Sequence, residues 1–426
     1  LGGAFSDGTS IFAAYNRGLL VSTNGGTSFV ASAATGLPAG ESLIGLAGAR
    51  AGATTRLFCV TALTNAVYPD PVGMPYGACR GLYSLDEGST SWVSRLAGLP
   101  TNETYALVAL CPTNIHTVYL AGRSTNYPNA HIYKSLDGGA TWGSVLHIST
   151  NVVSGWAGLP AVSKVNWGQT AGLAVDPRDP DHVVITDNGF THLTTNGGAI
   201  WQQAYLDPAT QNPPNTANPQ AKSYRGIGFE PTVPVWLAWI DATNLLAGFS
   251  DLGLTRSHDA GQSWNFDHSG LTNDEVYHIV VHPTSGAVYA DNQGATSPYM
   301  ILGLDDASTD RRFGPLMVST NGGQAWTALK HWLAAPVWEE MDPGDPETMY
   351  VSLMNSSNGG IQVTHNLSAG TNALWTDLGR HARANGRAYN IRVLHDGTLV
   401  TTFSCRQLAN GAFEPSSGVY VWNGGW

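Results

Sequence analysis

Short apolar runs, separated by glycine, proline, asparagine or aspartate, follow one another along the whole chain. One set of runs is rich in β-branched and aromatic residues, as at 117–121, 182–186, 244–249, 287–290 and 348–353. The runs that precede them tend to end in proline, as at 106–112, 171–177, 225–231, 277–283 and 336–343. Runs of this length and composition between turn residues predict β-strands rather than helices.

A turn motif with serine or threonine, then aspartate or asparagine, then glycine and an aromatic residue recurs along the chain. Copies begin at residues 22, 84, 135, 194, 257 and 319, and a degenerate copy begins at 364. This spacing of 45 to 63 residues is typical of propellers and other repeat architectures. Asn-Gly and Asp-Gly favour hairpin turns, where the Asp or Asn side chain accepts hydrogen bonds from its own turn. We therefore expect these carboxylates to be structural and the aromatic residue to anchor the returning strand in the core.

Four antiparallel strands accompany each turn, and this arrangement is a propeller blade. Residues 1–5 would supply a reduced first strand, and 387–395, 397–404 and 418–422 the last unit. We predict an all-β fold with one domain over residues 1–426, a single β-propeller of eight blades, with seven blades as the alternative. The repeats leave no room for a second domain.

The charge balance excludes several partners. The chain has 20 basic and 31 acidic residues, a net charge of −11, and only four lysines. No Lys/Arg cluster of the kind that selects nucleic acid or an anionic membrane is present, and no apolar run is long enough to span a bilayer. The start at Leu1 agrees weakly with a removed targeting segment, and the low lysine content favours a secreted or periplasmic location. We expect a monomer without a cofactor.

The four cysteines show no CxxC spacing and no metal-site pattern. Cys59 and Cys79 bracket one long loop between two predicted strands, so one reading is a local disulfide. The other reading is buried thiols, because unpaired cysteine is often buried.

The S-x-[DN]-x-G-x-[ST]-[WF] turn resembles the Asp-box (BNR) repeat of sialidases, secreted xyloglucan hydrolases and sortilin-type receptors. The resemblance covers nearly the whole chain and implies a propeller, but enzymes and binding proteins share this repeat. The sialidase pattern is not matched, because the Arg-Ile-Pro signature is missing and arginines gather only at 380–392.

The xyloglucan hydrolases fit better. The Asp-x-Gly segments at Asp187 and Asp251 resemble the segments that carry that family's catalytic aspartates. That family has two seven-bladed propellers with one catalytic aspartate in each, whereas here both segments belong to neighbouring blades of one predicted propeller.

Three aspartates, Asp187, Asp251 and Asp291, occupy equivalent loops between the second and third strands of consecutive units. Glycosidic hydrolysis needs one protonated and one ionised carboxyl group, so the leading hypothesis is a secreted glycoside hydrolase that degrades a polysaccharide. Asp187 and Asp251 would be the acid/base pair, with Asp291 in reserve. The alternatives are that each aspartate caps its own hairpin, or that the carboxylates bind calcium.

Loops between blades carry aromatic and basic residues that would suit carbohydrate binding. An aromatic ring stacks on the apolar face of a sugar, and polar groups bind its hydroxyls. The predicted substrate-binding residues are Trp156, Trp167, Tyr224, Arg225, Trp332, Arg383 and Arg387. The alternative for the tryptophans is packing between blades.

Arg383 and Arg387 belong to a basic run that would bind a uronic carboxylate. A second hypothesis is therefore a polysaccharide lyase with a Tyr or His base. The third is a non-catalytic carbohydrate- or protein-binding propeller.

Overall fold

The computed structural model describes most of the chain. The described residues are 2–15, 18–64, 76–124, 130–148, 150–156, 170–187, 189–214, 216, 219–227, 233–250, 252–273, 275–293, 314–355, 357–384, 387–403 and 418–425. They divide into two compact units. Unit 1 comprises Leu1–Asn218 and Ile227–Pro231, and unit 2 comprises Pro219–Gly226 and Thr232–Trp426.

Unit 1 contains four antiparallel sheets, each with its strands in chain order. The first two sheets are β1 (Gly3–Ser6), β2 (Ile11–Tyr15), β3 (Gly18–Ser22), β4 (Val30–Ala31) and then β5 (Glu41–Ala51), β6 (Thr54–Leu63), β7 (Cys79–Asp86), β8 (Val93–Ser94). The next two are β9 (Glu103–Leu110), β10 (Val118–Ser124), β11 (Ala130–Ser135), β12 (Gly143–Ser144) and then β13 (Gly172–Asp176), β14 (Asp179–Thr186), β15 (Thr191–Thr194), β16 (Gln202–Gln203).

Unit 2 contains the other four sheets, two of them with three strands. The first two are β17 (Pro234–Trp239), β18 (Leu245–Phe249), β19 (Leu254–Ser257) and then β20 (Ile279–Val281), β21 (Val288–Asp291), β22 (Pro315–Ser319), β23 (Thr327–His331). The last two are β24 (Ala335–Asp342), β25 (Asp345–Met354), β26 (Gly360–Thr364), β27 (Trp375–Gly379) and then β28 (Ala388–Val393), β29 (Leu399–Phe403), β30 (Gly418–Trp422). The described helices are short 3-10 turns: Tyr76–Ala78, Pro208–Thr210 and Leu367–Asn372.

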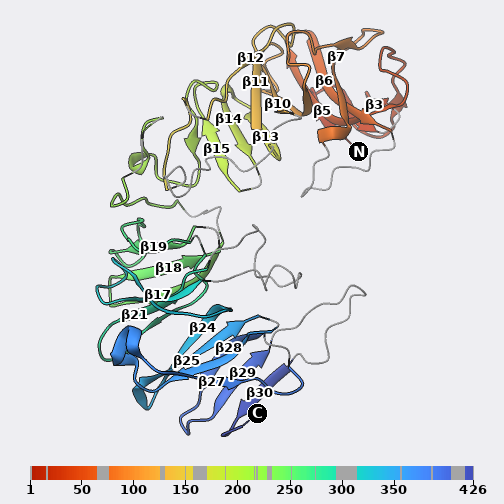
Figure 1. Ribbon diagram of the computed structural model, residues 1–426. Coiled ribbons are helices and arrows are strands. Elements are labelled where there is room, and N and C mark those ends of the chain that lie inside the picture. The colour runs from red at the N-terminus through yellow and green to blue at the C-terminus, as the bar shows by residue number, and fades with distance from the viewer. Residues whose placement is uncertain are drawn as a thin grey trace. The chain divides into compact units, whose positions relative to one another are not determined.

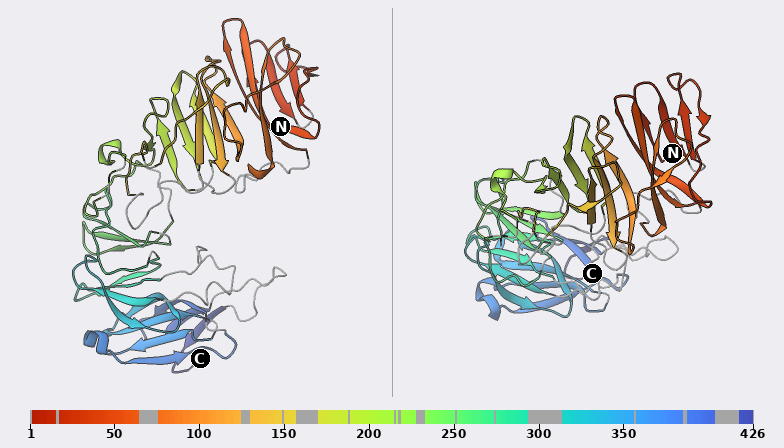
Figure 2. Two further views of the ribbon diagram at one scale, coloured as in Figure 1. Left: turned by 45° about the horizontal axis from the view of Figure 1, so that its top comes forward. Right: turned by 90° about the horizontal axis from the view of Figure 1, so that it is seen from above.

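Successive sheets are neighbours through their first strands. In unit 1, β1 contacts β5, β5 contacts β9, and β9 contacts β13. In unit 2, β17 contacts β20, β20 contacts β24, and β24 contacts β28 (Figure 1, Figure 2). This is the blade packing of a propeller, so the predicted all-β propeller fold with eight blades is confirmed.

One predicted strand is wrong. The first strand of the fifth sheet was expected at 225–231, but it is β17, Pro234–Trp239. The expectation followed the rule that this strand ends in proline. Here a proline starts the strand, where its missing N–H breaks no hydrogen bond inside the ladder. The fourth strand of this sheet is reduced to one bridge, between Arg256 and Asn265.

The recurring turn is held by its own side chains, as the sequence predicts. In the third sheet, Ser135 Oγ accepts a hydrogen bond from the Gly139 amide at 2.7 Å and donates one to Asp137 Oδ1 at 2.8 Å. The Thr141 hydroxyl donates to Asp137 Oδ2 at 2.6 Å, and the Thr141 amide donates to Oδ1 at 2.8 Å. The Thr141 hydroxyl, then the Thr141 amide and the Ser135 hydroxyl, lower the pKa of Asp137. The copies at Ser257 and Ser319 repeat the pattern.

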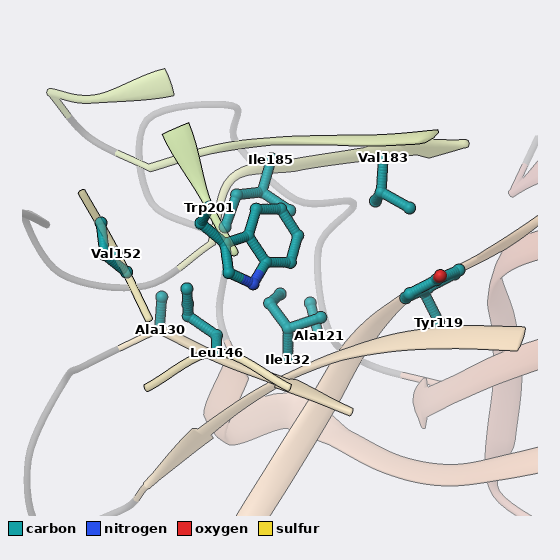
Figure 3. Close-up of a cluster of buried hydrophobic side chains, with 9 residues drawn as sticks. All are labelled: Tyr119, Ala121, Ala130, Ile132, Leu146, Val152, Val183, Ile185 and Trp201. Carbon is teal, nitrogen blue, oxygen red and sulfur yellow. The ribbon is translucent and has the colours of Figure 1, made fainter. Parts of the chain in front are cut away.

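The aromatic residue after the turn packs between neighbouring sheets in several copies. Trp201 is fully buried among side chains of the third and fourth sheets, and its Nε1 donates to the Val145 carbonyl at 2.8 Å (Figure 3). Trp92 and Trp326 are also buried. Phe29 of the first copy is an exception, because 42% of it is exposed.

The cysteines that the structure describes are buried thiols. Cys59 lies opposite Tyr83 on the neighbouring strand, whereas Cys79 lies opposite Ala62, so the two are offset along the ladder and the disulfide reading is wrong. Burial raises the pKa of Cys59, and it raises the pKa of Cys79 to about 12. Cys111 is the third buried thiol, and Cys405 lies outside the described residues.

Candidate functional site

A groove of about 650 Å³ lies in unit 2, where the outer strand of the sixth sheet meets the outer strands of the seventh. Its walls come from β23 and the residues after it, from the loop between β25 and β26, and from β26 and β27. The lining residues are Lys330, His331, Trp332, Leu333, Leu353, Ser357, Asn358, Gly359, Gln362, Trp375, Asp377, Gly379 and Arg380. Both aromatic and charged side chains line it.

Two tryptophans form the aromatic part of the groove. The ring centroids of Trp332 and Trp375 are 5.1 Å apart, and the ring planes meet at 87°. Both side chains are partly buried, because they also pack against the apolar core between the sixth and seventh sheets. An edge-to-face pair of this kind is rigid and favourable, so the groove presents a fixed aromatic surface.

Backbone hydrogen bonds shape the polar part of the groove. Asn355 Oδ1 accepts from the amides of Ser357 and Asn358, which fixes the loop between β25 and β26. Arg380 Nη1 donates to the Ser357 carbonyl at 3.4 Å, and Asp377 Oδ1 accepts from the Gly379 amide at 2.7 Å. These hydrogen bonds fix the polar wall of the groove. Asp377 is the one carboxylate among the described residues that line it.

The predicted catalytic aspartates are not brought together in this groove. Asp187 belongs to unit 1, where its Oδ1 accepts from the amides of Gly189 and Phe190 at 2.8 and 2.6 Å and closes the hairpin. Asp251 lies outside the described residues. Asp291 is fully buried at the end of β21, and its Oδ1 accepts from the amides of Tyr277 and His278 at 2.9 and 2.7 Å.

Asp291 belongs to a buried polar cluster that also contains Glu339, His278 and Gln293. Gln293 Nε2 donates to Asp291 Oδ2 at 2.9 Å and also to the Pro336 carbonyl. His278 Nδ1 lies 3.0 Å from Glu339 Oε2, while Glu339 Oε1 has no hydrogen-bond partner among the residues that the structure describes. Burial, and then the charge of Glu339, raise the pKa of Asp291 well above its usual value, and burial raises the pKa of Glu339 to about 8.

Glu339 was not among the predicted site residues. It follows a continuous buried stretch of β24, Ala335–Trp338, and is itself buried. An unbroken apolar run of this kind is typical of a strand buried on both faces, and it was the signal for a buried carboxyl at this position.

The predicted substrate-binding residues are dispersed. Trp332 lines the groove. Trp156 is buried against Phe190 and Tyr205, with ring centroids 6.1 and 5.5 Å away. Tyr224 and Arg387 are buried, which argues against direct contact with a polymer, while Arg225 and Arg383 are exposed outside the groove. Trp167 lies outside the described residues.

The described residues hold no group of three His, Cys, Asp or Glu side chains that would bind a metal ion. None of their helices has the length and apolar character needed to cross a membrane.

Comparison with known proteins supplies a fold and no family. No protein-family model matches this sequence, and no curated protein matches it. A GH74 xyloglucanase from Xanthomonas campestris superposes with a TM-score of 0.55 at 16% identity, over 93% of this chain and 50% of that enzyme. An ancestral GH74 enzyme superposes with a TM-score of 0.53 at 17% identity, over 98% of this chain and 62% of that enzyme.

The chain thus spans about half the length of the xyloglucanase. At such identities the likeness concerns the fold alone, because one fold carries many functions. The chain has the all-β propeller-type fold that these glycoside hydrolases also have.

Proposed function

We propose that this chain is a carbohydrate-active propeller of the glycoside hydrolase type, and that the groove of unit 2 binds a segment of a polysaccharide. The observation that carries the proposal is the pair Trp332 and Trp375 beside the polar side chains of Lys330, Gln362 and Arg380. Saccharide sites need an apolar ring to stack on and hydrogen-bond donors around it. The proposal also includes that the recurring turns are Asp boxes and that the protein is extracellular.

The test of binding is affinity gel electrophoresis over a panel of neutral and acidic polysaccharides. Trp332→Ala should weaken retention by about tenfold, because it removes the stacking surface. Trp239→Ala is the matched control, since Trp239 is 56% exposed and lies outside the groove. If the two variants are retained equally, and circular dichroism shows that both are folded, the groove is not the polysaccharide-binding site.

Hydrolysis is the second part of the proposal, with Asp187 and Asp251 as the acid/base pair. The fold shared with the two GH74 enzymes and the equivalent positions of the two aspartates support it. Asp291 is better assigned to structure, because its carboxylate is enclosed by backbone amides and Gln293.

The test of hydrolysis is a reducing-end assay with product absorbance read at 235 nm in parallel. Asp187→Asn and Asp251→Asn should each lower turnover by at least 100-fold if they act as acid and base. Full activity in both variants refutes the pair. Reducing ends with absorbance identify the lyase, and binding without turnover identifies a non-catalytic propeller.

A further inference from the structure

We infer that the groove of unit 2 selects an acidic polysaccharide, with the carboxylate of a uronic acid residue beside Lys330 and Arg380. The inference rests on the proposed function, since it presupposes that a saccharide occupies this groove, and it adds the class of sugar.

The charge of the groove is opposite to that of the chain. The whole sequence has 31 acidic and 20 basic residues. The groove has the cations Lys330 and Arg380 with His331 beside them, against the single carboxylate of Asp377. Asp377 accepts a hydrogen bond from the Gly379 amide, so one of its carboxylate oxygens is engaged within its own turn. A groove of this kind attracts an anion, although the net charge of the chain is −11.

The position of Lys330 is fixed by strand β23. It lies on β23 opposite Leu316, one residue before the end of the strand, and its side chain is half-buried. Within the described residues its ammonium group has no hydrogen bond and no ion pair, whereas Lys134 pairs with Asp181 at 2.7 Å. An ammonium group beside a groove is stabilised by an incoming carboxylate through a charge-assisted hydrogen bond.

Arg380 stands on the opposite wall, directly after β27. Its Nη1 contact with the Ser357 carbonyl at 3.4 Å orients the guanidinium group against the loop between β25 and β26. Guanidinium groups bind carboxylates with two parallel hydrogen bonds, so Arg380 and Lys330 offer different but complementary donors.

The aromatic wall explains why the anion would be a sugar and not a simple ion. Trp332 and Trp375 offer a rigid apolar surface next to the two cations. A uronic acid residue has both required features, an apolar C–H face and a carboxylate at the ring edge. A neutral sugar would stack on the tryptophans and accept hydrogen bonds from the polar side chains, but it would give the two cations no anionic partner.

The experiment compares an acidic polysaccharide with its own neutral methyl ester, and it adds further acidic and neutral polymers. Affinity gels contain polygalacturonate, the same polymer fully methyl-esterified, alginate, neutral xyloglucan or dextran sulfate. We expect polygalacturonate or alginate to be retained at least tenfold more tightly than the esterified and neutral polymers, as a charge-assisted hydrogen bond implies. Lys330→Gln should remove this preference, and Lys330→Arg should keep most of it. Arg178→Gln makes the same charge change at a side chain that is 88% exposed in unit 1, and it should have no effect.

Each of the other possible outcomes refutes a stated part of the inference or of the proposed function. Neutral and esterified polymers bound as well as the acidic ones, with loss on Trp332→Ala, would keep the saccharide site and refute the acidic preference. An acidic preference unchanged by Lys330→Gln would refute the role of this groove in selecting charge. Equal binding of dextran sulfate would show simple polyanion attraction in place of carboxylate recognition. No retention of any polymer would refute the proposed function and the acidic preference together.

Discussion

His278 Nδ1 lies 3.0 Å from Glu339 Oε2, and the two side chains are almost completely buried, between β20 and β24 of unit 2. Burial lowers the pKa of His278 to about 3, and it raises the pKa of Glu339 to about 8. At neutral pH the proton therefore sits on the carboxyl group, and the contact is a hydrogen bond between neutral groups. The geometry alone would suggest an ion pair, but desolvation of both groups opposes charge separation here.

This pair makes stability depend on pH in a defined direction. The pKa of Glu339 in the folded state, about 8, lies above its ordinary value of 4.5. The group therefore contributes full stability below about pH 4.5 and loses it as the pH rises through about 8. Glu339→Gln cannot ionise, so between pH 6.5 and 8 the Tm of the wild type should fall relative to that of the variant, and the difference should level off at higher pH. His278 is present in both proteins, and its own contribution is lost mainly as the pH falls below 6.5 toward 3. Parallel Tm curves for the two proteins would contradict the assignment.

Trp201 should be among the most costly core residues to truncate in unit 1. It is fully buried between two sheets, and it donates a hydrogen bond to the Val145 carbonyl. Trp201→Ala should destabilise the protein by about 3–5 kcal/mol, since a large cavity remains between the sheets. The measurement is urea unfolding followed by circular dichroism. Trp239→Ala, at an exposed position, should cost less than about 1 kcal/mol; similar losses at the two sites would contradict this packing.

Gly270 lies where a β-carbon cannot fit. Its φ is +89°, and an added Cβ would collide with the backbone carbonyl oxygen of Trp326. Gly270→Ala should lower stability by about 2–5 kcal/mol, combining positive-φ strain with overpacking against backbone. Gly286 is the matched control, because its φ is +69° and an added Cβ would meet nothing within 4 Å. Gly286→Ala should cost only about 1–2 kcal/mol in the same urea titration. Equal losses would show that strain alone matters at Gly270.

The serine of the recurring turn should matter more than the threonine. Ser135 Oγ is buried and accepts from the Gly139 amide, so Ser135→Ala leaves that amide without its acceptor. The expected loss is about 1–3 kcal/mol. Thr141 Oγ1 also bonds Asp137, at 2.6 Å, but it is exposed, so Thr141→Ala should cost less than about 1 kcal/mol. Thermal unfolding of both variants tests the order, and a larger loss at Thr141 would reverse our reading of the turn.

The fold was predictable because its determinants are local. Each turn contains its own hydrogen-bond acceptors, as Ser135 and Asp137 show, and copies of that turn occur in seven of the eight sheets. The strands that follow were placed to within a few residues wherever an apolar run was bounded by turn residues. The error at 225–231 arose where two nearby prolines, Pro231 and Pro234, left the start of the strand ambiguous.

The sites were less predictable because they depend on which sheets become neighbours. The sequence alone singled out Trp332 and the run containing Arg380, but it did not indicate that Trp375 and Lys330 share a groove with them. That groove exists because the outer strand of one sheet meets the next sheet. Likewise, the apolar run before Glu339 indicates that this part of β24 is buried, but only the packing of other sheets around the carboxyl group produces the burial that raises its pKa. Local hydrogen bonding and hydrophobic period thus determined the elements from sequence, while contacts between residues distant in the chain decided the groove and the buried acid.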